Sequence, residues 1–180
     1  MKLWDKGFST DKKIDHFTVG NDRELDLHLA KYDVIASKAH AKMLGEIGLL
    51  TPKETKDLVN ELNNIAARIE KGTFSIEKSF EDMHSKIEYM LTLSLGDTGK
   101  KIHTARSRND QVLVAMHLYL KDELTEIKSM TKSLFNLLLV KAQEHKDVML
   151  PGYTHLQIAM PSSFGLWFSA YAESLIDDLY

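Results

Sequence analysis

The sequence predicts an all-α protein, with a small helical domain over residues 1–98 and the first long helices of an elongated bundle over residues 99–180. Apolar residues recur at steps of three and four along most of the chain, which is the spacing of one helix face. No segment shows the strict alternation of apolar and polar residues that is typical of strands. Between residues 100 and 150 the chain has neither glycine nor proline, so no helix breaker interrupts that stretch.

Three helices are expected in the first domain, and each is followed by a glycine, the typical C-cap residue. The first follows an apolar series over residues 25–47. The second begins at residues 51–54 (TPKE), which form a capping box with proline at the first helical position, and it ends before Gly72. The third covers about residues 80–95.

The second domain is expected to begin with one very long helix. At 1.5 Å per residue, about 35 residues would form a helix of about 50 Å. Its apolar residues lie close to a heptad seam: Leu113, Met116, Leu120, Leu124, Ile127, Leu134 and Leu138. Pro151 and Gly152 are expected to make a sharp turn, after which a further helix through Leu166 and Leu179 folds back. Two helices cannot cover each other on all sides, so we expect the chain to self-associate through them.

Composition excludes several classes of protein. The 180 residues suffice for a domain with a core, and a charge of -3 argues against a general nucleic-acid binder, which would be basic. The chain has no cysteine, so it has neither disulfides nor thiolate metal sites. It shows neither a signal-peptide pattern at its start nor an apolar run long enough to cross a membrane. A cytoplasmic protein is expected.

The first candidate binding segment is residues 103–111 (HTARSRNDQ), at the expected start of the long helix. Arg106 and Arg108 offer fork-shaped donors suited to carboxylates, and Ser107 and Asn109 add neutral donors. A free helix N-terminus with such side chains favours an anion site. The alternative is a solvated helix start with a local Arg–Asp pair through Asp110.

The second candidate segment is residues 151–157 (PGYTHLQ). Thr154 is expected to cap the following helix, and His155 beside it can donate or accept a proton near neutral pH. The alternative is that His155 only hydrogen-bonds a carbonyl group of the turn. The other histidines are expected to be structural, although His84 and His103 are the weakest cases for that interpretation.

These motifs carry a family resemblance that extends along the whole chain. The string HTARSRNDQ, followed after a long helix by PGYTHLQIAMP at residues 151–161, resembles the argininosuccinate lyases of the fumarase/aspartase superfamily. Residues 3–8 (LWDKGF) resemble the opening motif of that family, and residues 81–84 (EDMH) resemble its Glu-Asp-x-His motif. The residues around the Asn-Asp pair favour the argininosuccinate branch over fumarases, aspartases and adenylosuccinate lyases.

The resemblance implies a fold, a reaction and an assembly. The fold is a fumarase/aspartase-like helical bundle, and the family forms homotetramers with sites shared between subunits. The reaction is the β-elimination of argininosuccinate to arginine and fumarate, without metal or organic cofactor. The dicarboxylate part of the substrate would be held by Ser107, Arg108, Asn109 and Thr154. His155 would be the acid/base histidine of the family.

Two departures from the family leave alternatives open. Family members are much longer, so the chain is expected to be an N-terminal portion without the loop that carries the catalytic serine, and to lack turnover alone. Residues 17–23 differ from the usual substrate-binding segment, which leaves open a related, N-acylated substrate. A non-catalytic role of the delta-crystallin type, or as a helical interaction module, is the alternative from another class.

Overall fold

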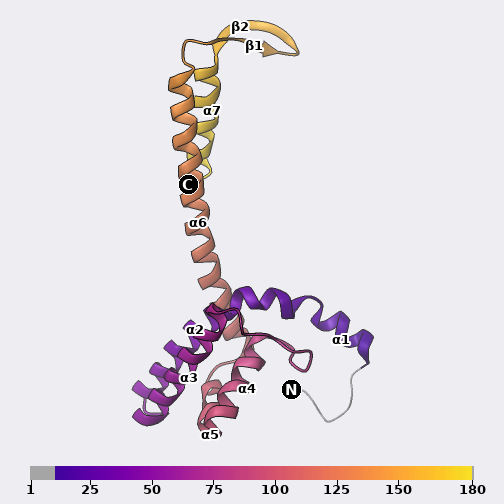
Figure 1. Ribbon diagram of the computed structural model, residues 1–180, viewed down its shortest axis with the longest axis vertical. Helices are drawn as coiled ribbons and strands as arrows, with labels where there is room; N and C mark the ends of the chain where they lie inside the picture. Colours follow the sequence, from indigo (N-terminus) through magenta and orange to yellow (C-terminus); the bar gives the residue numbers. More distant parts are fainter. Residues whose placement is uncertain (1–10, 180) are drawn as a thin grey trace. The chain divides into compact units, whose positions relative to one another are not determined.

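The computed structural model describes residues 11–179, and the expected opening motif at residues 3–8 lies outside them. The order of elements is α1 (Lys12–Val19), α2 (Asp22–Glu46), α3 (Pro52–Glu70), α4 (Met83–Leu95), α5 (Asp97–Lys100), the 3-10 helix η1 (Lys101–His103), α6 (Arg108–Glu144), β1 (Met149–Thr154), β2 (Gln157–Ser163) and α7 (Phe164–Asp177) (Figure 1). The chain divides into two compact units, one up to Leu120 and one from Lys121, and α6 contributes to both. The predicted domain boundary between residues 98 and 99 stays a prediction.

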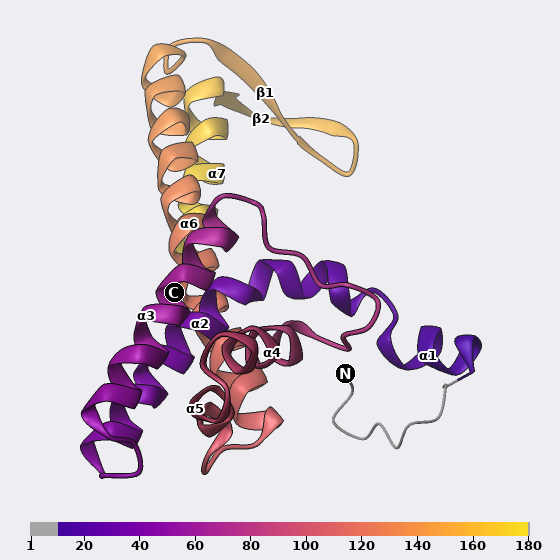
Figure 2. The same cartoon turned by 60° about the horizontal axis from the view of Figure 1, so that its bottom comes forward.

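The first unit is built on three helices that pack on one another. Helix α2 packs against α3 and α4, and α3 also packs against α4 (Figure 2). The fully buried apolar side chains between them include Leu44, Leu58, Leu62, Ile65, Ile87 and Leu91. The first turns of α6 join this core through Ala115 and through Tyr119, whose ring packs edge-on against Tyr32 at 5.8 Å between centroids. The start of α6 is thereby fixed to the core of the first unit.

Local capping chemistry sets the helix boundaries of this unit, largely where the sequence predicts them. Thr51 and Glu54 form the expected capping box, in which each side chain accepts the backbone N–H of the other. Helix α4 begins at Met83, a little later than expected, because the Asp82 carboxylate accepts the N–H of Ser85 at 2.7 Å and caps the helix there. Residues 17–23, where the chain departs from the family pattern, form the end of α1, a link at Gly20 and the start of α2.

In the second unit, α7 lies beside the C-terminal part of α6, and the β1–β2 hairpin connects them (Figures 1 and 2). Helix α6 is unbroken, as predicted. Gly165 allows the close approach of α7, because a Cβ there would lie 2.7 Å from the Cα of Lys146. Within residues 11–179, no helix is long and apolar enough to cross a membrane.

The hairpin is the exception to the all-α prediction, which is otherwise confirmed. Pro151 and Gly152 do not make the expected turn, and Thr154 does not cap a helix, because all three lie in β1. The chain reverses at His155 and Leu156, which both have left-handed φ angles of 50° and 63°. Residues 153–161 are all exposed, so this part of the hairpin buries neither face. Its sequence therefore does not show the alternation of apolar and polar residues that indicates a strand. Helix α7 is instead capped by the Ser163 hydroxyl, which accepts the Leu166 N–H at 3.2 Å.

Candidate functional site

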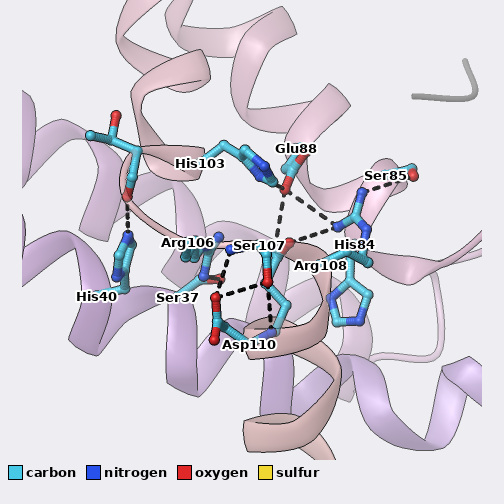
Figure 3. A network of polar contacts seen from close by, with 12 residues as sticks. Ser37, His40, His84, Ser85, Glu88, His103, Arg106, Ser107, Arg108 and Asp110 are labelled. Atoms are coloured by element: carbon cyan, nitrogen blue, oxygen red, sulfur yellow. Dashed lines mark hydrogen bonds and ion pairs between the residues drawn. The ribbon is translucent and has the colours of Figure 1, made fainter. Parts of the chain in front are cut away.

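The candidate site in the first unit is built around the N-terminus of α6. Ser107 precedes the helix and caps it together with Asp110 (Figure 3). Arg108 and Asn109 are the first two helical residues, and their N–H groups belong to the turn for which a helix provides no carbonyl partner. Three of the predicted site residues, Ser107, Arg108 and Asn109, therefore adjoin one positive helix end, which suits a carboxylate.

Arg108 is held against the first turns of α4. Its Nη2 donates to the Ser85 hydroxyl at 3.2 Å, and its Nη1 donates to the side-chain oxygen of Gln111 at 2.9 Å. The carboxylates of Asp82 and Glu88 flank the same guanidinium, each with an oxygen 3.4 Å from an Arg108 nitrogen. The alternative of an Arg–Asp pair through Asp110 is wrong for Arg108. The acidic partners of Arg108 are Glu88 of α4 and Asp82, which caps α4.

Arg106 and His40 fix the loop that leads into α6. Arg106 donates through Nη1 to the hydroxyl of Ser37 at 3.1 Å, and His40 Nε2 lies 2.9 Å from the carbonyl oxygen of Thr104 (Figure 3). Burial lowers the pKa of the Arg106 guanidinium, against the opposing effect of Asp33, and burial also lowers the pKa of His40. Both side chains help to line a cavity of about 390 Å³ together with Ala36, Ala39, Met43, Asp110, Gln111 and Val114.

A buried polar pair connects α2 to α4 beneath this site. His84 Nδ1 lies 2.9 Å from Asp33 Oδ1, and the two side chains are only 2% and 1% exposed. Nearby, Asp26 accepts the N–H of Met83 at 3.0 Å, and burial raises the pKa of its carboxyl group. Because the pair is sealed from solvent, His84 acts as a structural link between the helices, which is the default expectation for this histidine.

Thr154 and His155, the other two predicted site residues, adjoin each other at the turn of the hairpin in the second unit. Both are exposed, and the backbone of His155 has a φ of 50°, which is uncommon for a residue other than glycine. The predicted site residues thus form two groups. One group adjoins the start of α6, and the other is carried by the hairpin.

Sequence reasoning missed the α4 residues that contact Arg108. Ser85 and Glu88 are three positions apart, so they share a helix face directly after the EDMH motif at residues 81–84. That motif and the helical spacing together were the available signal. In residues 11–179, no group of three or more His, Asp or Glu side chains is arranged to hold a metal ion.

Solved structures share this fold. EDDS lyase in complex with formate aligns with a TM-score of 0.73 and 23% identity over 95% of this chain and 34% of the lyase. The fumarate lyase:delta crystallin structure from Brucella melitensis aligns with a TM-score of 0.73 and 20% identity, over 92% of this chain and 44% of that one. At this level of identity the likeness establishes the fold alone.

Sequence similarity establishes the family, because a family model described as lyase matches residues 7–179. The chain belongs to this lyase family. The argininosuccinate lyase of Phocaeicola vulgatus is 58% identical over 99% of this chain and 40% of its own length. That of Thermotoga neapolitana is 45% identical over 99% of this chain and 45% of its own length. The resemblance to argininosuccinate lyases is thus confirmed, and the chain spans less than half the length of these curated relatives.

Proposed function

We propose that this chain forms the carboxylate-binding part of an argininosuccinate lyase, which splits argininosuccinate into arginine and fumarate in arginine biosynthesis. The relatives named for this activity support the proposal, since they match along nearly the whole chain. The observation that carries it is the N-terminus of α6, where Ser107, Arg108 and Asn109 come together at a positive helix end. Such an end binds the carboxylates of a succinyl group.

The proposed reaction begins when a base removes a proton from the succinyl carbon next to one of these carboxylates. The electron pair left behind spreads onto that carboxylate, so negative charge grows where donors must already be in place. In the proposal, the first N–H groups of α6 and the side chains of Arg108 and Asn109 stabilise this charge. The C–N bond then breaks: the electron pair on carbon forms the double bond of fumarate, the electrons of the broken bond stay on nitrogen, and this nitrogen takes up a proton to complete the guanidinium group of arginine.

The hairpin residues have a separate task in the proposal. Thr154 donates a hydrogen bond to a substrate carboxylate, and His155 exchanges the proton or orients the group that does. The exposed positions of both side chains support this, because neither is committed to a core. No metal or organic cofactor enters the proposed mechanism.

The proposed assembly is a cytoplasmic homotetramer formed through the long helices. In the second unit, α6 exposes Leu124, Met130, Leu134 and Leu137, and α7 exposes Leu166 and Trp167. Exposed apolar rows of this kind on paired helices support association, because large apolar patches rarely stay in water. A site shared between subunits would then bring hairpin residues of one chain to a carboxylate site of another.

A chimera tests the proposed function directly. This chain replaces the matching segment of the Phocaeicola vulgatus argininosuccinate lyase, and fumarate release from argininosuccinate is followed by ultraviolet absorbance. We expect turnover on the order of 1–10 per second, within the ordinary range for enzymes, and none from the 180-residue chain alone. A folded, tetrameric but inactive chimera beside an active parent enzyme would contradict the proposal. If the chimera cleaves only an N-acylated substrate, then that compound and not argininosuccinate is the substrate.

A further inference from the structure

Glu88 of α4 is the common partner of three side chains around the candidate site (Figure 3). Its Oε1 lies 3.1 Å from Nδ1 of His103, 3.4 Å from Nη1 of Arg108 and 3.1 Å from Nε2 of Gln111. Its side chain is only 19% exposed. One carboxylate oxygen therefore joins η1 and the first turn of α6 to α4.

The surroundings of Glu88 make this contact restrictive. Gln111 is fully buried, and its amide group is used at both ends, since its nitrogen donates to Glu88 and its oxygen accepts from Arg108. Glu88, Gln111 and Arg108 thus form a closed ring, in which each side chain contacts the other two. Ser85, one turn earlier on α4, accepts from the other terminal nitrogen of Arg108. The guanidinium plane is thus fixed from two directions.

We propose that Glu88 is a positioning residue that orders Arg108 at the N-terminus of α6 before a carboxylate ligand binds. An arginine side chain that is already ordered loses less conformational freedom on binding than a free one, so its ligand binds more tightly. Glu88 itself need not touch the ligand. The ordering of Arg108 follows from the contacts alone, and only its consequence for a dicarboxylate rests on the proposed function.

Glu88 also has an opposing electrostatic effect, which gives the proposal its test. A carboxylate beside Arg108 partly neutralises the charge that attracts an anion. If neutralisation outweighed ordering, removal of Glu88 would strengthen anion binding. The contacts favour ordering, because the same Glu88 oxygen also contacts Gln111 on α6 and His103 on η1.

The experiment uses the whole chain with nitrogen-15-labelled arginine, and fumarate is the probe. Glu88→Ala removes the oxygen, whereas Glu88→Gln keeps an acceptor at the same place without the charge. Glu61→Ala is the matched control, because Glu61 also accepts two side-chain hydrogen bonds, from Ser94 and Asn64, but on α3. The resonance of the Arg108 Nε–H reports side-chain order, and a titration gives the dissociation constant for fumarate.

We expect Glu88→Ala to move the Arg108 resonance towards the position of a freely rotating arginine and to weaken fumarate binding by about fivefold or more. Glu88→Gln should preserve most of both properties, and Glu61→Ala should change neither. An unchanged Arg108 resonance or tighter fumarate binding in Glu88→Ala would overturn the proposal. If Glu88→Ala does not fold, Glu88→Asp takes its place, because the shorter side chain withdraws the carboxylate oxygen from Arg108: loss of Arg108 order then supports the proposal, and full retention of order overturns it.

Failure of the proposed function would look different. If the wild-type chain binds no fumarate while Arg108 is ordered and Glu88→Ala releases it, the positioning role holds and the assignment of the ligand fails.

Discussion

The backbone N–H of Ser107 donates to Oδ2 of Asp110 at 2.7 Å, and the N–H of Asp110 donates in return to the Ser107 hydroxyl at 3.4 Å. The Ser107 hydroxyl also donates to Asp110 Oδ2 at 2.9 Å. These contacts hold the pKa of Asp110 below its usual value, first through the backbone N–H and then through the hydroxyl. In the proposed function, Ser107 has a second task as part of the carboxylate site.

Replacement of Ser107 by alanine should therefore weaken the start of α6. We expect Ser107→Ala to lower the free energy of unfolding by about 1 kcal/mol, the usual cost of a lost N-cap. Urea unfolding followed by circular dichroism measures this. Ser133→Ala is the control, because Ser133 lies within α6 and its hydroxyl bonds only the preceding turn, at the carbonyl of Ser129. An equal loss in both variants would mean that the cap contributes nothing.

Glu54 provides a prediction for pH dependence. Its pKa falls from 4.5 to about 2, chiefly through the hydrogen bond from Lys101 and then through the N–H of Thr51. Because the folded-state pKa is lowered, the stabilisation by Glu54 is present above pH 4.5 and is lost as the pH falls towards 2. Glu54→Gln should be less stable than wild type at pH 7. The difference in stability between the two should shrink as the pH falls from 4.5 towards 2. Thermal unfolding at a series of pH values measures it, and a constant difference would contradict it.

The buried pair of Asp33 and His84 should be far more costly to break. Asp33→Ala leaves His84 without its partner at a site sealed from solvent, so we expect a loss of about 3 kcal/mol or more in the free energy of unfolding. Glu70→Ala, at the exposed end of α3, should change stability by no more than about 0.5 kcal/mol. Urea unfolding compares the two. A small loss at Asp33 would show that water or another side chain replaces the pair.

Self-association should depend on the apolar residues that α6 exposes in the second unit. Leu134, which is 47% exposed, lies beside the polar Ser133 on the same helix. Leu134→Lys should shift the chain towards monomer in sedimentation experiments, because a charge would be buried at the contact. Ser133→Lys adds the same charge one position away and should leave the assembly intact. A wild-type chain that stays monomeric at high concentration would refute the proposed assembly.

The elements that can be predicted from the sequence are those fixed by interactions between residues close together along the chain. The helix starting at Thr51 was predictable because its cap, its proline and its apolar face all lie within a few positions. The hairpin was not, since its strands are held by backbone pairing and bury no face. Its turn uses two residues, His155 and Leu156, that carry none of the usual turn chemistry.

The candidate site divides in the same way. The local sequence leaves Thr104 and Ser107 as candidates for the cap of the long helix, and the fold decides for Ser107 and brings Arg108 its partners. Ser85 and Glu88 precede Arg108 by 23 and 20 positions and reach it only because α4 and α6 pack on one core. The chain enters α6 through Ala105, whose left-handed φ of 59° is not predictable from an alanine. Packing between helices far apart in the sequence thus determines which groups Arg108 contacts.

His155 can be tested in the chimera with the Phocaeicola vulgatus enzyme. His155→Asn removes the titratable ring but suits the left-handed backbone at this position, which asparagine adopts more readily than most residues. We therefore expect thermal stability to stay near that of the unsubstituted chimera, while kcat falls by about a hundredfold, as for the loss of an acid/base group. Leu156→Asn is the matched control, because Leu156 is 98% exposed and has the same backbone conformation. Normal turnover in a folded His155→Asn chimera would leave His155 with no part in catalysis, and the proton would have to move through another group.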